Sequence, residues 1–219
     1  RSYMSRIIME QPNFLYNFTN LGYQSYYIAQ EELDLMEKLH FDTLRLGALL
    51  DNVAQSEPFL RDANITGIDM KSLSWQAVNH PSGFPNGIDA RTICALARYA
   101  GISDRMELFG VFELFNTIVS HQLLAQIIWY FIEGFSSRFG EYPVLTSTGF
   151  TRYTVALSDI EMVFYESEKS KRWWMEIINQ SYLNNKNKTT ALLPCTHQDY
   201  LEACNDKIPD KWWKATKRM

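Results

Sequence analysis

Two acidic residues, Asp69 and Glu113, stand where their carboxylates could bind a metal ion or a cationic substrate. Asp69 ends the apolar run 63–70, and a loop rich in proline and glycine follows it. A strand, an acid, an irregular loop and a helix, in this order, place a carboxylate at the carboxyl edge of a parallel sheet, where ligands bind. Such a carboxylate can ligate a hard divalent ion such as Mn²⁺. The alternative is that Asp69 caps the next loop or pairs with a basic neighbour.

Glu113 lies inside the otherwise apolar run 109–115 (FGVFELF). Glutamate is rarely buried without a partner, so a charge in such a run needs a reason. A carboxylate that faces a cleft from the end of a strand is one such reason. The alternative is a structural ion pair with an arginine such as Arg98 or Arg105. Substrate binding and ion pairing therefore both stay open for Glu113.

Other reactive residue types show no catalytic or metal-binding spacing. Among the histidines only His80, in the loop after Asp69, is near the expected edge, and we expect Cys94 to be a packing residue. Two motifs, Arg172-Trp173-Trp174 and Lys211-Trp212-Trp213, could stack a ligand ring, but paired tryptophans more often close a core. The four histidines without H-x-x-x-H or H-x-H spacing are His40, His80, His121 and His197.

The composition excludes several classes of protein. The chain has 219 residues, 46% of them hydrophobic and 21% charged, with a net charge of −4. This balance gives no electrostatic case for nucleic acid or a membrane surface. The longest apolar run, 123–132, falls short of the ~20 residues of a membrane span. The cysteines are three, an odd number without C-x-x-C spacing, so we expect reduced thiols in a cytoplasmic protein.

The elements that must position the two carboxylates alternate between strand and helix. Such alternation predicts parallel βα units and an α/β fold. We predict strands over residues 17–21, 40–47, 63–70 and 106–115, and helices over residues 30–39, 49–60, 90–100 and 121–139.

Turn-forming residues bound these elements. Pro58 should end the helix 49–60 early, Gly101 should close the helix 90–100, and Gly140 and Pro143 should stop the helix 121–139. The remaining predictions are a hairpin over 151–165 with its turn at Ser158-Asp159, a loop over 179–190, and a helix over 198–205 capped by Thr196.

The stretch 64–86 resembles the signature of the ureohydrolase superfamily, which comprises arginase, agmatinase and formimidoylglutamase. Those enzymes carry S-F-D-x-D-x-x-D-P there, and this chain reads GIDMKSLSW over residues 67–75. Asp69 matches the first acid, whereas Lys71 and Ser74 replace the second and third. Residues 113–116 (ELFN) also resemble the E-V-N-P element, with the glutamate retained and the asparagine displaced by one position.

The resemblance implies a three-layer α/β/α sandwich around a mainly parallel sheet, incomplete at its amino-terminal side. The chain would be the carboxyl-terminal portion of a divergent bacterial formimidoylglutamase-like member. Residues 1–219 would form a single α/β domain, with residues 144–219 as an extension that holds the hairpin and a terminal helix. The sheet edge left open would favour a homo-oligomer.

The implied activity is hydrolysis of a C–N bond in a guanidino or formimino compound at a manganese centre. Asp69 would ligate metal and Glu113 would bind the substrate, while no catalytic acid or base is assigned. An ammonium at Lys71 repels a dication, and most of the superfamily's ligands lie in motifs that these residues lack. We therefore expect that this chain alone does not hold the two-metal centre.

Two other functions compete with this one. The first is a non-catalytic relative that keeps the fold as a binding or assembly module. The second is an unrelated α/β protein that binds a carbohydrate or nucleotide. The chain lacks a glycine fingerprint such as G-x-G-x-x-G or G-x-x-x-x-G-K, which counts against nucleotide binding.

Overall fold

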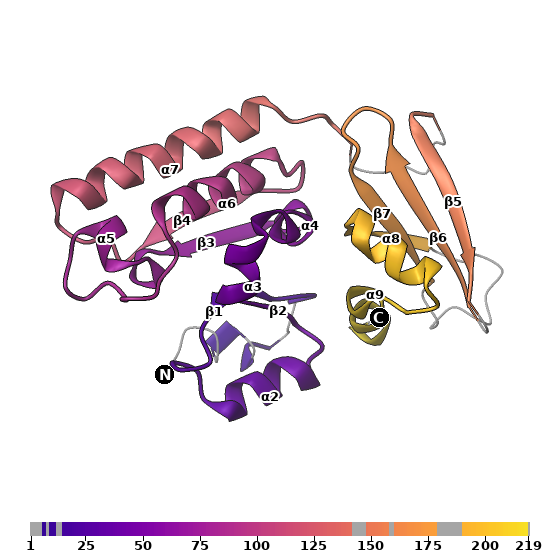
Figure 1. The fold of residues 1–219 in the computed structure, drawn as a ribbon, viewed down its shortest axis with the longest axis horizontal. Helices are drawn as coiled ribbons and strands as arrows, with labels where there is room; N and C mark the ends of the chain where they lie inside the picture. The colour runs from indigo at the N-terminus through magenta and orange to yellow at the C-terminus, as the bar shows by residue number, and fades with distance from the viewer. Residues whose placement is uncertain are drawn as a thin grey trace.

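The structure is a computed structural model, and it describes residues 6–7, 9–11, 15–141, 148–157, 160–178 and 190–218. These residues form two parts, each with its own hydrophobic core. We name residues 15–141 the α/β part and the described residues of 148–218 the antiparallel part (Figure 1). No helix in the described ranges is both long and apolar enough to cross a membrane.

The α/β part contains two pairs of parallel strands. Strand β1 pairs with β2, and β3 pairs with β4, with helices between the partners of each pair. Parallel strands need such crossover connections, so the predicted βα alternation and the α/β fold are confirmed. The elements are β1 (Thr19–Tyr23), α2 (Gln30–Lys38), β2 (Asp42–Arg45), α3 (Leu46–Asp51), η1 (Val53–Ser56), α4 (Glu57–Arg61), β3 (Ile65–Asp69), η2 (Met70–Ser72), α5 (Trp75–Val78), α6 (Ala90–Ile102), β4 (Leu108–Phe112) and α7 (Ile118–Ser136).

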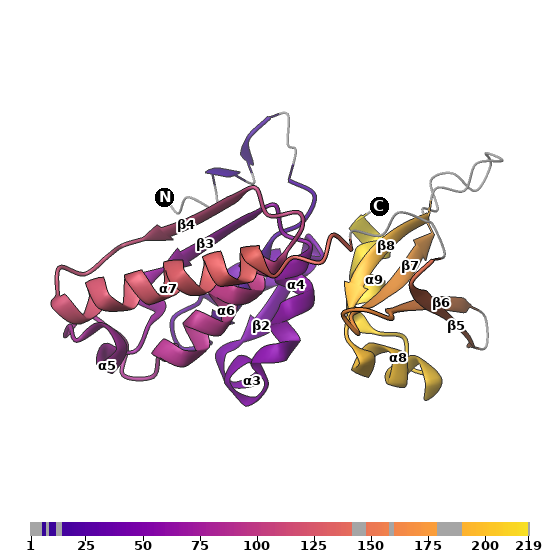
Figure 2. The same ribbon diagram turned by 90° about the horizontal axis from the view of Figure 1, so that it is seen from above.

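Helices α6 and α7 lie on the same side of strands β3 and β4 (Figure 2). Ile68 of β3 is buried in this core, and Phe109 of β4 stacks on Phe131 of α7 at 4.2 Å between ring centroids. The side chains on the opposite face of the two strands are more than half exposed: Ile65, Leu108 and Phe112. Among the described residues this pair of strands is therefore covered on one face.

Two glycines let α6 and α7 approach each other closely. A Cβ atom at Gly101 would lie 2.1 Å from the carbonyl oxygen of Phe131, and one at Gly134 would lie 2.3 Å from that of Arg98. The prediction that Gly101 closes the helix 90–100 is wrong, because α6 continues to Ile102. Gly101 is required for the helix contact and does not act as a cap.

The prediction of one helix over residues 49–60 is also wrong. Asn52 has an extended backbone (φ −151°, ψ 90°) that separates α3 from η1, and its side chain accepts a hydrogen bond from the N–H of Ala54. Pro58 lies in the first turn of α4 and not at a helix end. Proline fits there because the first turn leaves its N–H groups unpaired in any case.

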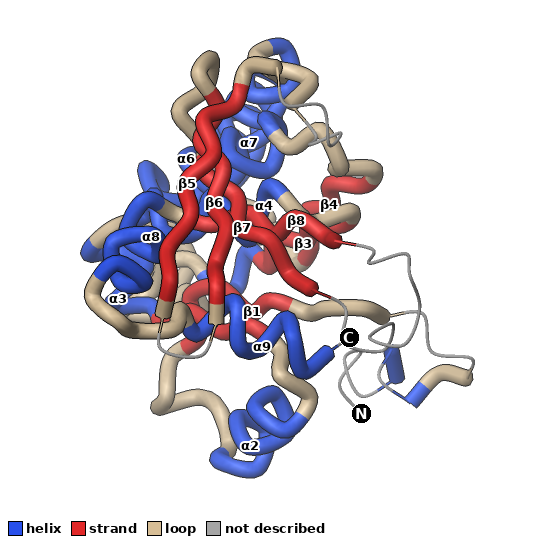
Figure 3. Tube along the Cα trace, turned by 90° about the vertical axis from the view of Figure 1, so that its right-hand side faces the viewer, coloured by secondary structure: helices blue, strands red, loops and turns tan. Residues whose placement is uncertain are grey.

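The antiparallel part is a four-stranded sheet in the order β5-β6-β7-β8 (Figure 3). The pairing of β5 with β6 confirms the predicted hairpin. Three other predictions lie outside the described residues: the hairpin turn at Ser158-Asp159, the helix stop at Pro143, and the loop over residues 179–189. Thr196 caps the next helix through a capping box with Asp199, as predicted. The elements are β5 (Phe150–Ala156), β6 (Glu161–Ser167), β7 (Trp173–Ile178), β8 (Thr190–Cys195), α8 (His197–Cys204) and α9 (Asp210–Arg218).

The prediction of a single, mainly parallel sheet differs from the structure. Among the strands that the structure describes, parallel pairing is found in two separate two-stranded sheets, and the other four strands pair antiparallel. For β5, β6 and β7 the reason is local, because consecutive strands joined by short connections pair antiparallel. The predicted single domain over residues 1–219 thus holds two hydrophobic cores, and its division into domains stays a prediction.

Candidate functional site

Strands β3 and β4 end together at one edge of their sheet. The two strands pair in parallel register, with Asp69 opposite Phe112, so Glu113 follows directly beyond the paired segment. Strands that run the same way present their carboxyl ends at a common edge, the usual place for ligands in α/β folds. The structure therefore brings the two predicted site residues, Asp69 and Glu113, to the same edge.

Asp69 organises the turn that leaves β3. Its Oδ1 accepts a hydrogen bond from the backbone N–H of Lys71 at 2.9 Å, and its carbonyl oxygen accepts one from the hydroxyl of Ser72 at 2.6 Å. Asp69 thus caps η2, as the simpler of its two interpretations predicts. Asp69 stays exposed in this turn.

Glu113 forms an ion pair with Lys71 across the strand ends. Its Oε2 lies 2.6 Å from Lys71 Nζ, and each side chain is about half exposed, at 54% and 53%. The hydrogen bond and the charge of Glu113 raise the pKa of Lys71 above its ordinary 10.5. The prediction of Arg98 or Arg105 as the structural partner is wrong, because these arginines pair with Glu133 and Asp62.

The backbone of Glu113 explains why its side chain points back toward β3. Strand β4 ends at Phe112, three residues before the predicted end at residue 115, and Glu113 has a φ of +57°. This left-handed conformation is uncommon for a residue with a Cβ atom. It turns the chain out of the strand at the position where the carboxylate meets Lys71.

The loop after Asp69 is hydrogen-bonded back onto Leu73 and Ser74. The N–H of Ser74 donates to the carbonyl of Ile88 at 2.9 Å, and the N–H of Phe84 donates to that of Leu73 at 3.1 Å. The Ser74 hydroxyl accepts from the N–H of Ala77 at 3.4 Å and so caps α5. Ser74 therefore has a structural role in this chain.

His80 packs beside this edge. Its ring stacks on Phe115 with 4.7 Å between centroids, and its Nδ1 accepts a hydrogen bond from the N–H of Ser82 at 3.2 Å. The hydroxyl of Thr117 donates to the carbonyl of Val78 at 2.7 Å. These contacts join the loop to the segment between β4 and α7 and keep the edge in one arrangement.

The described residues do not fit a manganese centre. Nowhere in the described ranges do three or more His, Cys, Asp or Glu side chains lie close enough together to hold a metal ion. At the edge itself, the cation beside the two carboxylates is the Lys71 ammonium, which bonds Glu113. An ammonium offers donors and no lone pair, so Lys71 cannot serve as a ligand in its charged form.

Cys94 and three of the four tryptophans in the two sequence motifs are packing residues, whereas Trp213 is 49% exposed. Cys94 is a buried free thiol whose pKa is raised by burial, which makes it a poor nucleophile. Trp173, Trp174 and Trp212 are buried in the antiparallel part, so the packing interpretation of the tryptophan motifs is confirmed for them. The sequence analysis did not identify the polar residues between the two parts.

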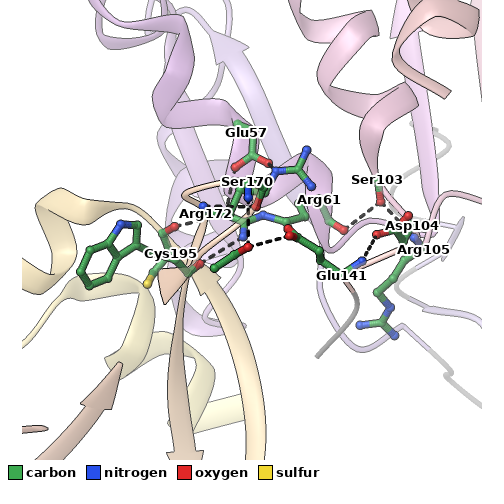
Figure 4. Close-up of polar contacts among 11 residues, drawn as sticks. Glu57, Arg61, Ser103, Asp104, Arg105, Glu141, Ser170, Arg172 and Cys195 are labelled. Carbon is green, nitrogen blue, oxygen red and sulfur yellow. Dashed lines mark hydrogen bonds and ion pairs between the residues drawn. The ribbon is translucent and has the colours of Figure 1, made fainter. Parts of the chain in front are cut away.

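A cluster of buried charges joins α4 to the antiparallel part (Figure 4). Arg61 donates to the carbonyls of Trp173 at 3.1 Å and Cys195 at 3.2 Å, and it also pairs with Glu57 at 2.9 Å. Glu57 also forms an ion pair with Arg172, with 3.3 Å between Glu57 Oε1 and Arg172 Nε. The i,i+4 spacing of Glu57 and Arg61 was the only sequence signal of this cluster, whose role is to hold the two parts together.

A second buried ion pair joins α9 to β2. Arg218 Nη1 lies 3.1 Å from Asp42 Oδ2, and only 4% of each side chain is exposed. The same nitrogen donates to Asn17 Oδ1 at 2.5 Å and to the carbonyl of His40 at 2.7 Å. The carboxyl-terminal helix is thus bonded to the first pair of strands.

Comparison with known proteins identifies the fold. No protein-family model and no curated protein matches the chain. The formiminoglutamase of Trypanosoma cruzi is similar with a TM-score of 0.53 and 16% identity, over 61% of this chain and 50% of that one. An arginase superfamily protein from the same organism gives 0.52 and 17%, and the formiminoglutamase with Mn²⁺ gives 0.51 and 18%, each over 61% of this chain and 48% of theirs.

These matches confirm the predicted resemblance at the level of the fold. The chain shares an α/β fold with formiminoglutamase and arginase superfamily structures, and it spans about half the length of the solved structures that it matches.

Proposed function

We propose that this chain is part of a ureohydrolase-like enzyme that hydrolyses a C–N bond of a guanidino or formimino compound. The observation that carries the proposal is the common edge of β3 and β4, where Asp69 ends one strand and Glu113 follows the other. The fold shared with formiminoglutamase supports it. In an intact enzyme we expect further elements to cover the outer face of β3 and β4 and complete a three-layer sandwich.

Glu113 is the proposed substrate contact. Guanidinium and formamidinium groups are planar cations with several N–H donors, and a carboxylate binds them through charge-assisted hydrogen bonds. Lys71 Nζ, itself a cationic donor, lies 2.6 Å from Glu113 Oε2. A substrate cation would replace Lys71 on this carboxylate, so the lysine competes with the substrate for the site.

Asp69 is the proposed metal ligand, in a centre completed by residues other than those described. Manganese, when bound, would supply Lewis-acid activation of a water molecule. Because the described residues do not fit such a centre, the proposal assigns no step to the metal. Within this chain, Asp69 keeps the Lys71 backbone in place through its hydrogen bond at 2.9 Å.

The ion pair between Lys71 and Glu113 favours a second candidate function. A carboxylate that is already neutralised by its own chain can serve in a non-catalytic relative, which binds an amidine or assembles with a partner. The two functions predict different results when manganese is supplied.

The test measures turnover and binding in the same preparation. The full-length protein that contains these residues is incubated with Mn²⁺ and with arginine, agmatine or formiminoglutamate, while release of urea or formamide and the bound metal are measured. Activity that depends on Mn²⁺ and disappears in Glu113→Gln supports the hydrolase. The matched control is Glu107→Gln at the other end of β4, whose carboxylate accepts a hydrogen bond from Asn64; this variant should stay active.

Binding without turnover would identify the non-catalytic relative. We then expect Lys71→Met to bind agmatine about tenfold more tightly, because removing one charge-assisted competitor is worth ~1.4 kcal/mol. Glu113→Gln should lose the binding. If neither turnover nor amidine binding depends on Glu113, both candidate functions are wrong.

A further inference from the structure

A small cavity lies where α4 meets the antiparallel part. Its volume is about 10 Å³, and its lining includes Arg61 and Glu141 from the α/β part and Arg172 and Trp174 from the antiparallel part. Both parts of the chain therefore bound the cavity, and charged side chains from each of them reach it.

Arg61 has one N–H group for which the described residues supply no acceptor. Its Nη1 donates to the carbonyl of Trp173, and its Nη2 donates to Glu57 and to the carbonyl of Cys195. Its Nε is buried and has no hydrogen-bond partner among the described residues. Only 7% of the side chain is exposed. A buried donor of a charged group is strongly unfavourable when it stays unpaired, so this N–H requires an acceptor.

Glu141 has the complementary need for a donor. Its Oε1 accepts a hydrogen bond from the hydroxyl of Ser167 at 2.6 Å, whereas its Oε2 is buried and has no partner among the described residues. Figure 4 shows the Glu141 carboxylate beside the Arg61 side chain, and both residues line the same cavity. An unpaired donor and an unpaired acceptor therefore meet this cavity without bonding each other directly.

The chemistry of these two atoms determines what can occupy the cavity. The occupant must accept a hydrogen bond from Arg61 Nε and donate one to Glu141 Oε2. An ammonium or metal ion cannot accept such a bond, and the two arginines would repel it. A halide cannot donate, and Glu141 would repel it. Water can do both, and one water molecule needs a cavity of about 10–15 Å³.

We propose that one buried water molecule bridges Arg61 Nε and Glu141 Oε2. Such waters make about three hydrogen bonds, to protein groups that are otherwise unpaired, and they bind nearly as well as a direct hydrogen bond. The water extends the polar contacts of Glu57 and Arg61 to Glu141 and Ser167, from α4 to β6 across the boundary of the two parts. The site is independent of the proposed function, because it lies away from the carboxyl edge of β3 and β4.

The first test counts long-lived waters by magnetic relaxation dispersion of the water deuterons. The full-length protein that contains these residues is compared with Glu141→Met, which keeps the length of the side chain and removes the acceptor. The variant should hold one long-lived water fewer. Glu133→Met is the matched control, because the Glu133 carboxylate bonds Arg98 and does not line the cavity. An unchanged count in Glu141→Met would overturn the proposal, and so would an equal loss in Glu133→Met.

The second test is a crystal structure of the wild-type protein, so it does not depend on whether a Glu141 variant folds. We expect one electron-density peak within roughly 2.7–3.2 Å of both Arg61 Nε and Glu141 Oε2. After a soak in bromide, this peak should give no anomalous signal. A direct bond between the two atoms, a bromide signal between them, or the lack of any peak there would each overturn the proposal.

Discussion

Lys71 determines the electrostatic character of the edge at which β3 and β4 end. Its ammonium bonds Glu113, while its backbone N–H bonds Asp69. Ion pairs exposed to this degree contribute little to stability. The pair matters because Lys71 occupies the Glu113 carboxylate, to which the cation of a ligand could otherwise bind.

The pKa of Lys71 reports directly on this pair. Since Glu113 raises that pKa, the stabilising contribution is fully present below the ordinary value and is lost as the pH rises through the raised value. We predict that Glu113→Gln lowers the pKa of Lys71 back toward 10.5, measured by NMR titration of the lysine side chain. The melting temperature should change little.

Glu107→Gln serves as the control for this titration, because Glu107 lies at the start of β4 and bonds Asn64. It should leave the Lys71 pKa where it is in the wild type. An unchanged Lys71 pKa in Glu113→Gln would show that the ion pair does not persist in solution.

The sequence predicted the positions of the two carboxylates but not their contact. An apolar run followed by a proline- and glycine-rich loop identified Asp69, and a charge in an apolar run identified Glu113. The partner of Glu113 depends on a left-handed backbone at a non-glycine residue. No residue type specifies that conformation, so the choice of Lys71 could not be predicted.

At the scale of elements, the contact between α6 and α7 depends on the close approach of the two helix backbones. Gly101 and Gly134 each lie against a carbonyl of the other helix. Glycine normally weakens a helix interior by about 1 kcal/mol relative to alanine. Here the loss is offset by closer packing of the two longest helices over β3 and β4.

We predict that Gly101→Ala lowers the free energy of unfolding by at least about 2 kcal/mol, as overpacking does, despite the better helix propensity of alanine. Urea denaturation measures this change. Gly47→Ala is the matched control, because Gly47 is also helical and a Cβ there meets nothing within 4 Å. It should raise stability by about 0.5–1 kcal/mol, and a similar gain in Gly101→Ala would contradict the close contact.

The strands and the longer helices of the α/β part were predicted well, and its short helices were not. Helices α2, α6 and α7 and strands β1 to β4 lie near their predicted positions. The segment 46–61 divides into three short helices because Asn52 breaks the backbone and Pro58 starts a new turn. Apolar spacing continues through these breaks, so the pattern alone predicted one helix.

At the scale of the molecule, buried polar groups join the two parts. Arg61 reaches carbonyls of two strands of the antiparallel part, and Arg218 reaches Asp42 of β2. Two nitrogens of Arg218, Nε and Nη2, are buried and have no hydrogen-bond partner among the described residues. The guanidinium therefore depends strongly on the Asp42 charge.

We predict that Asp42→Asn destabilises the chain by about 3 kcal/mol, because breaking a buried ion pair leaves an uncompensated charge. Chemical denaturation measures the change. Asp210→Asn is the control, since Asp210 pairs with Lys214 on α9 but is largely exposed, and it should change stability by less than about 1 kcal/mol. Equal effects of the two substitutions would contradict a buried Asp42–Arg218 pair.

These pairs could not be predicted from the sequence, because their partners are far apart along the chain. Asp42 lies in the predicted strand 40–47, whereas Arg218 lies beyond the predicted helix 198–205. Their burial follows from the contact between the two hydrophobic cores, which no local pattern describes.

Because charged groups fix how the two parts meet, the two cores are free to diverge at different rates. We expect an apolar substitution inside either core to act mainly on the packing of that core. A change at Asp42 or Arg218, in contrast, is tolerated only together with a compensating change in the other part. Among related sequences we expect the residues at positions 42 and 218 to change together, while residues inside the two cores change independently of each other.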